Sequence, residues 1–436
     1  MHFLPRTETL VIEAAQRTAR GHGAPGPSTP PTGARFSLVL LFYYLGVILV
    51  ITLAPFRFST PEDLRVLLSG GWFDVVANVL LFVPLGFLYP LTRPSQQSPS
   101  PAQVWMLGVL LSGLIETAQL FEGERYTSLI DVLANGAGAG AGASLQRLAA
   151  QRIHLNARLI GRLSLELPLM GIVYLLVPLL WLTSMAAGAE PLGMLPLLFV
   201  GLFGGRVLAA LQHHHFGPAG ALSPRGVAGV AAGWMLVGAF PTLASQPILG
   251  GAAILAVSAA AGAEAARLGR SQRTPERRFE VRTLRGAAPW LGAYFAAMML
   301  VPLARGASPW TWWVGFSGRV EALGTAEQLY LLESVAALTV VGYLLAEIRS
   351  RRELAFRAVA PRLILECGLL SAAVEGVRGF QVAWGASLAQ LLLLWGAGLL
   401  GGWIYHLQRD HVREIASQGS GAAVKGSSFT TGRLTT

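Results

Sequence analysis

Acidic, amide and basic side chains gather in apolar stretches of the first third of the chain, where a charged group is costly to bury. The stretch that starts at residue 73 opens with Asp74 and Asn78, which are four residues apart and share one helical face. The full set is Arg57, Asp74, Asn78, Glu116, Gln119, Arg125, Asp131 and Asn135. Arginines in such a cluster could bind anionic headgroups, and Glu116 or Asp131 could act as a general base on a lipid phosphate.

Most of these residues also have a purely structural explanation. Ser128 and Asp131 have the S-x-x-D spacing of a helix N-cap followed by an acidic third residue. Asp74 lies in the first turn of its stretch, where a carboxylate interacts favourably with the helix dipole. Arg57 and Arg125 stand where arginines commonly anchor a helix at the lipid headgroups.

Glu116 is the residue that a structural explanation covers least well. It lies about one turn inside its apolar stretch, beside Gln119, and no Lys or Arg occurs in the same stretch. We therefore expect a buried partner for it, either Arg125 or Arg57. Structure or function could equally require that pair.

Other motifs indicate packing rather than chemistry. The glycine run N-G-A-G-A-G-A-G-A (135–143) lies inside an apolar stretch, and its Gly138 and Gly142 form a G-x-x-x-G, which predicts close helix packing. The chain has no H-E-x-x-H, G-x-S-x-G or Walker sequence, and its single cysteine, Cys367, excludes an intrachain disulfide. We expect no metal site and no cofactor, and catalysis by a well-known hydrolase constellation is unsupported.

The elements that must position these residues are apolar helices. The 436 residues are 53% apolar and only 13% charged, well below the roughly 25% charged residues of an average soluble domain. A spanning helix needs about 20 mostly apolar residues. Twelve blocks predict an all-α, polytopic transmembrane helix bundle: 36–54, 73–91, 102–121, 128–148, 166–185, 192–212, 226–242, 246–266, 286–303, 327–347, 359–379 and 385–407. Residues 60–68, with Thr60 as the N-cap, are predicted to form a short surface helix.

Basic residues sort into alternate loops of this arrangement, as expected when positive charge stays on the cytoplasmic side. If the N-terminus is cytoplasmic, most of the 33 Lys and Arg residues fall in inner segments, and both termini are cytoplasmic. The basic residues assigned to outer segments are Arg57, Arg65, Arg125, Arg305, Arg319 and Arg378. The net charge of +10 follows from inner loops beside anionic lipids, so it does not indicate nucleic-acid binding.

The blocks group into three four-helix segments between two tails. Residues 1–35 and 408–436 are expected to be disordered cytoplasmic tails. The membrane segments are 36–150, 166–266 and 286–407, a 4+4+4 plan.

The third segment resembles a degenerate repeat of the first, because similar residues recur at a constant offset of 259. The pairs are Asp74 with Glu333, Ser112 with Ser371, Glu116 with Glu375, Phe121 with Phe380, and Ser128 with Ser387. Other polar positions are lost, since Asn78, Asp131 and Asn135 align with Ala337, Gln390 and Leu394. The second copy is therefore expected to keep a structural role.

Four motifs in residues 36–150 form one pattern. They are P-F-R-F (55–58), D-V-V-A-N-V-L-L-F-V-P-L-G-F-L-Y-P (74–90), L-I-E-T-A-Q-L-F (114–121) and R-Y-T-S-L-I-D-V-L-A-N-G-A-G-A-G-A-G (125–142). Together they resemble the VanZ-like family, whose polar positions correspond to the eight residues named above. The resemblance implies a bacterial cytoplasmic (inner) membrane protein with a cell-envelope role at the outer face. The family's name comes from antibiotic resistance to teicoplanin-type compounds, which the resemblance alone does not assign to this chain.

Three functions fit these features. The first is a non-catalytic envelope protein whose outer polar pocket binds an amphipathic ligand, such as a lipid-linked cell-wall precursor, a lipopeptide or a lipoglycopeptide, among membrane lipids. The second is an intramembrane enzyme acting on a lipid phosphate. The third is a lipid transporter or flippase, for which only Glu333, Glu366 and Glu375 offer polar groups in the later helices. We favour binding over catalysis and catalysis over transport, and the sequence gives no oligomeric state.

Overall fold

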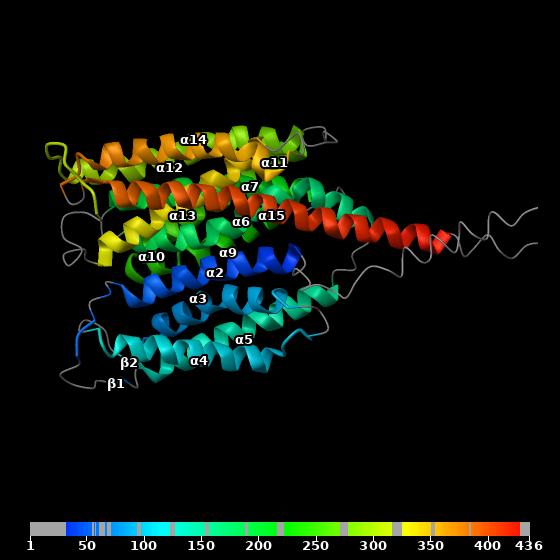
Figure 1. The fold of residues 1–436 in the computed structure, drawn as a ribbon, viewed down its shortest axis with the longest axis horizontal. Coiled ribbons are helices and arrows are strands. Elements are labelled where there is room, and N and C mark those ends of the chain that lie inside the picture. Colours follow the sequence, from blue (N-terminus) through cyan, green and yellow to red (C-terminus); the bar gives the residue numbers. More distant parts are fainter. Residues whose placement is uncertain are drawn as a thin grey trace, which may run out of the picture. The chain divides into compact units, whose positions relative to one another are not determined.

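The computed structural model of the chain describes residues 32–54, 56, 58–60, 66–67, 71–93, 97–122, 127–152, 157–187, 191–215, 222–270, 278–315, 325–349, 354–382 and 385–427. Over these residues the chain forms 13 α-helices and two sheets of two short strands each (Figure 1). The fold is an all-α helix bundle, as the apolar blocks predict.

Four helices make up what we call the first module: α2 (Thr32–Leu53), α3 (Trp72–Leu91), α4 (Pro101–Gln119) and α5 (Leu129–Arg152). α4 starts at a complete capping box. Gln103 N–H donates to Ser100 Oγ (3.3 Å) and Ser100 N–H donates to Gln103 Oε1 (2.8 Å), while Pro101 occupies the first helical position. These local signals fix where the helix that carries Glu116 begins.

α3 and α5 pack backbone against backbone. A Cβ atom added to Gly138 would lie 2.2 Å from Val79 O, and one added to Gly142 would lie 2.1 Å from Val83 O. Side chains cannot make contacts that short, so only glycine lets the two helices approach this closely. The predicted packing role of the glycine run is confirmed, and it holds the polar start of α5 against α3.

The middle segment contains α6 (Ala157–Ala186), η2 (Pro191–Gly193), α7 (Met194–His215), α9 (Pro224–Gly238), α10 (Phe240–Ser245) and α11 (Pro247–Gly269). The predicted block 226–242 is not one helix, because α9 ends at Gly238 and the chain turns into α10. Hydrogen bonds to α6 hold this break: Thr242 N–H donates to Ser184 Oγ (2.8 Å), and Thr242 Oγ1 donates to Ser184 O (3.1 Å). α10 is therefore anchored to the end of α6.

The second module consists of α12 (Arg278–Arg305), α13 (Thr325–Arg349), α14 (Phe356–Arg378) and α15 (Leu388–Ser427). α13 and α15 also pack through glycine, since a Cβ on Gly401 would lie 1.9 Å from Thr339 O. α15 continues well beyond the predicted block 385–407, and Gln408 and Val412 in this extension are buried. Gln408 is 3% exposed and its Oε1 accepts a hydrogen bond from Tyr343 OH at 2.6 Å.

Each module carries one pair of short parallel strands. β1 (Val66–Leu67) pairs with β2 (Thr127–Ser128), and β3 (Trp312–Trp313) pairs with β4 (Ala386–Ser387). The strands β2 and β4 lie at the offset that the sequence predicts for the repeat, which is what a duplicated module would produce. The sequence predicts a surface helix over residues 60–68, but residues 66 and 67 form a strand. Their backbone groups hydrogen-bond to β2, so the prediction is wrong at these two residues.

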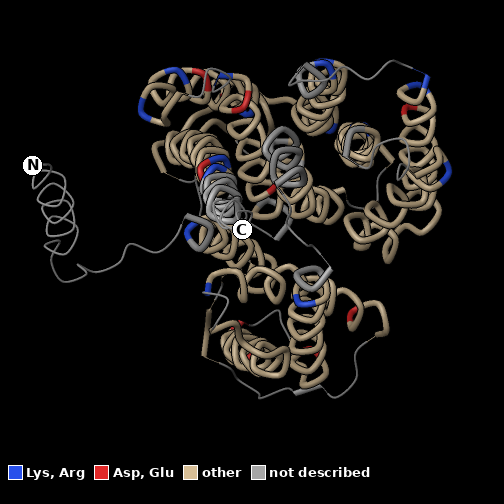
Figure 2. Tube along the Cα trace, turned by 90° about the vertical axis from the view of Figure 1, so that its right-hand side faces the viewer, with Lys and Arg blue, Asp and Glu red and all other residues tan. Residues whose placement is uncertain are grey.

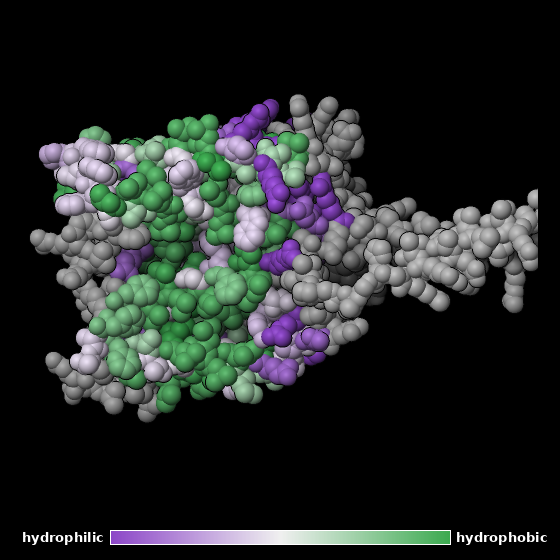
Figure 3. Space-filling model, viewed as in Figure 1, coloured by the Kyte–Doolittle hydropathy of each residue, from purple (hydrophilic) through white to green (hydrophobic). Residues whose placement is uncertain are grey.

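Eight helices of the described chain are long and apolar enough to cross a membrane, namely α2, α3, α4, α7, α11, α12, α13 and α15. The other four predicted blocks fall on α5, α6, α9 and α14, so every block lies on a helix. The number of twelve spans stays a prediction. The face shown in Figure 3 carries a broad band of hydrophobic side chains, as a membrane-embedded surface requires.

Helix α6 lies at the centre of the packing. Its Leu176, Leu179 and Leu180 are fully buried, and the helix contacts α7, α10, α13 and α15. The first module is joined to the second through α2, which contacts α13 and α15. Figure 2 looks along the helices from the end opposite the strands and shows Lys and Arg on several helices.

Candidate functional site

A cavity of about 540 Å³ lies between the first module and helices α6 and α10. Six of the eight residues singled out by the sequence line it: Asp74, Asn78, Glu116, Gln119, Asp131 and Asn135. The other two, Arg57 and Arg125, lie outside the described residues. Polar groups from three separate helices are thus brought together at one place.

Glu116 holds the start of α5. Its side chain is 6% exposed, and its Oε2 accepts the backbone N–H of Ser128 at 2.7 Å. Thr127 Oγ1 also donates to Glu116 O, at 3.1 Å. A carboxylate beside the first N–H groups of a helix is favoured by the helix dipole. Within the described residues, the Glu116 carboxylate is paired with a backbone amide. The expected pairing with Arg57 or Arg125 stays a prediction, because both arginines lie outside the described residues.

The predicted N-cap of α5 forms only in part. Ser128 Oγ accepts the Asp131 N–H at 3.3 Å, as the S-x-x-D spacing predicts. In a complete capping box the Asp131 carboxylate would accept the Ser128 N–H, but Glu116 already accepts from that donor. The Asp131 carboxylate instead lines the cavity near Asn78, and its Oδ1 makes no hydrogen bond within the described residues.

Two buried amides, Gln119 and Asn135, are among the residues that line the cavity. Gln119 is 8% exposed and donates through Nε2 to Thr52 O (2.8 Å), while Asn135 is 3% exposed and donates through Nδ2 to Ser112 Oγ (2.8 Å). In both amides the side-chain nitrogen is therefore the atom that is hydrogen-bonded. Gln119 Oε1 and Asn135 Oδ1 have no hydrogen-bond partner among the described residues, although both residues line the cavity. A buried acceptor without a donor is costly, so a donor that reached either oxygen would be stabilising.

Asp74 has the structural role that its position predicts. Gly71 N–H donates to Asp74 Oδ2 at 3.2 Å, which caps the start of α3. The residue is exposed, and it also lines the cavity together with Asn78 one turn later. Asp74 therefore adds negative charge to the site while stabilising its own helix.

The cavity is rich in hydrogen-bond acceptors. Three residues with carboxylates and three with amides line it, and the described lining residues include no Lys or Arg. No three acidic, His or Cys side chains of the described chain converge on one point in the manner of a metal site.

An apolar wall from the middle segment closes the cavity, and sequence reasoning missed it. Trp181 and Met185 of α6 and Phe240, Pro241 and Ala244 of α10 line this side. The rings of Trp181 and Phe240 stack with their centroids 6.3 Å apart. Nothing distinguishes these residues from other apolar residues in the sequence, and the only local signal is the Gly-Ala-Phe-Pro break that precedes α10. All polar residues of the lining thus come from the first module, which also contributes apolar residues, whereas α6 and α10 contribute only apolar ones.

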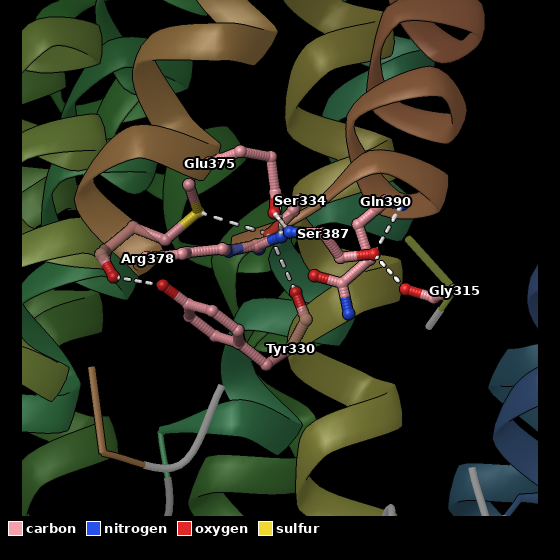
Figure 4. A network of polar contacts seen from close by, with 8 residues as sticks. Gly315, Tyr330, Ser334, Glu375, Arg378, Ser387 and Gln390 are labelled. Atoms are coloured by element: carbon pink, nitrogen blue, oxygen red, sulfur yellow. Dashed lines mark hydrogen bonds and ion pairs between the residues drawn. The ribbon is translucent and has the colours of Figure 1, made fainter. Parts of the chain in front are cut away.

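The corresponding place in the second module is filled by an arginine (Figure 4). Arg378 is fully buried, and it donates through Nη1 to Glu375 Oε1 (2.6 Å) and through Nη2 to Ser334 Oγ (2.5 Å). Glu375 Oε2 accepts the Ser387 N–H at 3.0 Å, which repeats the contact between Glu116 and Ser128.

Arg378, which the sequence assigns to an outer segment, is a buried helix residue rather than an exposed loop residue. It is the last residue of α14, and its burial is stabilised by Glu375 one turn earlier and by the Tyr330 ring, whose centroid lies 5.0 Å from the guanidinium carbon. A second acidic side chain of this module, Glu333, also accepts hydrogen bonds. Glu333 Oε1 accepts from Thr183 Oγ1 (2.9 Å) and Tyr294 OH (3.0 Å), which joins the second module to α6.

The described helices and their apolar surface define a polytopic α-helical membrane protein. Residues 30–150, which contain nearly all of the first module, match the family model described as VanZ/LLP1. The VanZ-like resemblance of this segment is therefore confirmed. No curated protein and no solved structure matches the chain.

Proposed function

We propose that this VanZ-type membrane protein binds an amphipathic ligand in the first-module cavity. The observation that carries the proposal is the two-sided lining: acceptors on α3, α4 and α5 face apolar side chains on α6 and α10. Such a site suits a ligand with a polar head and an acyl or prenyl chain. A lipid-linked cell-wall precursor or a lipoglycopeptide has both parts.

The strand end of the helices is assigned to the outer face of a bacterial cytoplasmic membrane, with both termini cytoplasmic. Support comes from the arginines of the described chain near the opposite helix ends, such as Arg93 just after α3, Arg267 on α11 and Arg349 on α13. The cavity then opens its polar residues toward the cell envelope, where cell-wall precursors and lipoglycopeptides are found.

Hydrolysis of a lipid phosphate is the second candidate. The observation that favours it is the Asp131 carboxylate, which lines the cavity and whose Oδ1 makes no hydrogen bond within the described residues, so that Asp131 is the candidate general base. Transport is less supported, since Glu333, Glu366 and Glu375 each have a hydrogen-bond partner in the packed bundle.

Native mass spectrometry of the purified protein tests binding. The wild type should retain a defined amphiphile, and Asn135→Leu, which copies the apolar Leu394 of the second module, should lose it. Glu116→Gln and Arg125→Ala should weaken retention. Thr117→Ala is the matched control, because Thr117 is exposed on α4 and bonds only Gly113 O of its own helix.

Two outcomes decide between the candidates. If all variants carry the same bulk lipids as the wild type, the cluster is a structural scaffold and the proposal fails. If a polyprenyl phosphate is converted to a dephosphorylated product by the wild type and not by Asp131→Asn, the site is an enzyme rather than a binding site.

A further inference from the structure

The two modules place the same carboxylate in the same setting with different neighbours. Glu116 and Glu375 each accept the N–H of a serine that starts the following strand and helix. In the second module the other oxygen of Glu375 accepts from the Arg378 guanidinium. At the aligned position the first module has Gln119, and no Lys or Arg of its described residues lines the cavity.

Gln119 does not take over the role of Arg378. Its Nε2 donates away from Glu116, to Thr52 O at the end of α2. In the second module the comparable bond to the first helix comes from a different residue, because Gln381 Nε2 donates to Met299 O (3.1 Å). Arg378 therefore does not take that role and donates to Glu375 instead. In the first module, Glu116 lines a cavity of about 540 Å³.

The groups that surround this space are acceptors. The Gln119 and Asn135 oxygens are more than nine-tenths buried and have no partner in the described chain, and the carboxylates of Glu116 and Asp131 lie beside them. An ordered water supplies two protons to such acceptors, but it cannot supply the positive charge that the carboxylates favour. A guanidinium or a primary ammonium group supplies both.

We propose that the polar head of the ligand is a hydrogen-bond-donating cation, a guanidinium or primary ammonium group, seated where Arg378 lies in the second module. This inference rests on the proposed binding function and names the chemical class of the headgroup. The second module is then a self-filled form of the site, and the first module is the form that takes its cation from a ligand.

The test copies the second module into the first. Gln119→Arg places a guanidinium beside Glu116, and it should reduce binding of dodecylguanidinium by at least about tenfold, the effect of losing a charge-assisted hydrogen bond. Gln119→Met, which is uncharged and similar in length, should reduce binding only a few-fold. Binding is measured by native mass spectrometry in a sugar-based detergent, with a thermal-unfolding curve for each variant to show that it is folded.

Four probes resolve the chemistry of the head. Dodecylguanidinium and dodecylammonium should bind the wild type more tightly than dodecyltrimethylammonium, which carries charge but donates no hydrogen bond. Methylguanidinium, which has no chain, separates an amphiphilic source of the cation from a water-soluble one, and it should bind more weakly than dodecylguanidinium. Equal binding of dodecylguanidinium and dodecyltrimethylammonium would overturn the hydrogen-bonding part of the inference.

Dodecyl phosphate distinguishes the failure of this inference from failure of the proposed function. If the wild type prefers dodecyl phosphate and Gln119→Arg strengthens that binding, the site is an anion site, the inference is overturned and the binding function stands. If no dodecyl probe binds above the level of the Asn135→Leu variant, the binding function fails as well.

Discussion

Arg378→Met tests whether the second module is held together by its buried ion pair. The guanidinium and the Glu375 carboxylate are 0% and 3% exposed, and their closest atoms are 2.6 Å apart. Removing the arginine leaves a buried carboxylate without its counter-charge, which typically costs about 3–5 kcal/mol. It also leaves the Ser334 hydroxyl without the Nη2 donor, at about 1 kcal/mol more. We expect the free energy of unfolding to fall by about 4–6 kcal/mol in total.

The assay is equilibrium unfolding in mixed detergent micelles, with two comparisons. Arg349→Met breaks the ion pair with Glu366, whose side chains are 41% and 24% exposed, and it should cost less than about 1 kcal/mol. The double variant Arg378→Met with Glu375→Gln removes both charges, while the amide oxygen that replaces the carboxylate can still accept the Ser387 N–H. It should be more stable than the sum of its single changes predicts, by at least about 1 kcal/mol.

Either of two results would refute this reasoning. The first is a cost for Arg378→Met no larger than that for Arg349→Met, which would mean that the buried pair contributes no more than an exposed one. The second is a double variant whose loss equals the sum of the single losses, because independent contributions would exclude a coupled pair.

Three further predictions concern the first module and the cavity wall. Gly142→Ala should lower the free energy of unfolding by about 1–3 kcal/mol, because the new Cβ would lie 2.1 Å from a backbone oxygen of α3, whereas Gly113→Ala, with nothing within 4 Å, should not lower it. Denaturant titration in micelles measures both. Ser128→Ala should cost about 1 kcal/mol in the same assay, because it removes the cap of α5 and keeps the N–H that Glu116 accepts. Thr242→Val should speed amide hydrogen exchange in α10 relative to α9, since it removes a hydroxyl bond to α6, and unchanged exchange would contradict the proposed anchoring.

The helices and the polar side of the cavity could be predicted because the membrane restricts the choices. Long apolar runs must form helices when water is absent, so all twelve blocks lie on helices. Ionisable groups in such runs turn inward, which brings Glu116 of α4 and Asp131 of α5 to one cavity. The glycine run was equally informative, since only close packing explains G-x-x-x-G in an apolar helix.

The features that the sequence did not reveal depend on contacts between distant segments. The S-x-x-D spacing predicts a cap, but Asp131 faces the cavity because Glu116, from another helix, accepts the Ser128 N–H first. Arg378 falls at the end of the predicted block 359–379, where an arginine is expected to reach the headgroups, and its contacts with Glu375 and Ser334 explain its burial. The apolar wall could not be recognised either, because Trp181 resembles any other apolar residue of a membrane helix.

The wall contributed by α6 and α10 has a consequence for how the protein can be divided. The family match ends at residue 150, before α6 begins, so the segment that defines the family holds every polar residue of the cavity but not its apolar side. A fragment that stops after α5 would keep the complete set of acceptors on an open groove. In this chain, therefore, the recognisable domain and the smallest piece able to enclose a ligand are different units, and the second extends at least to α10.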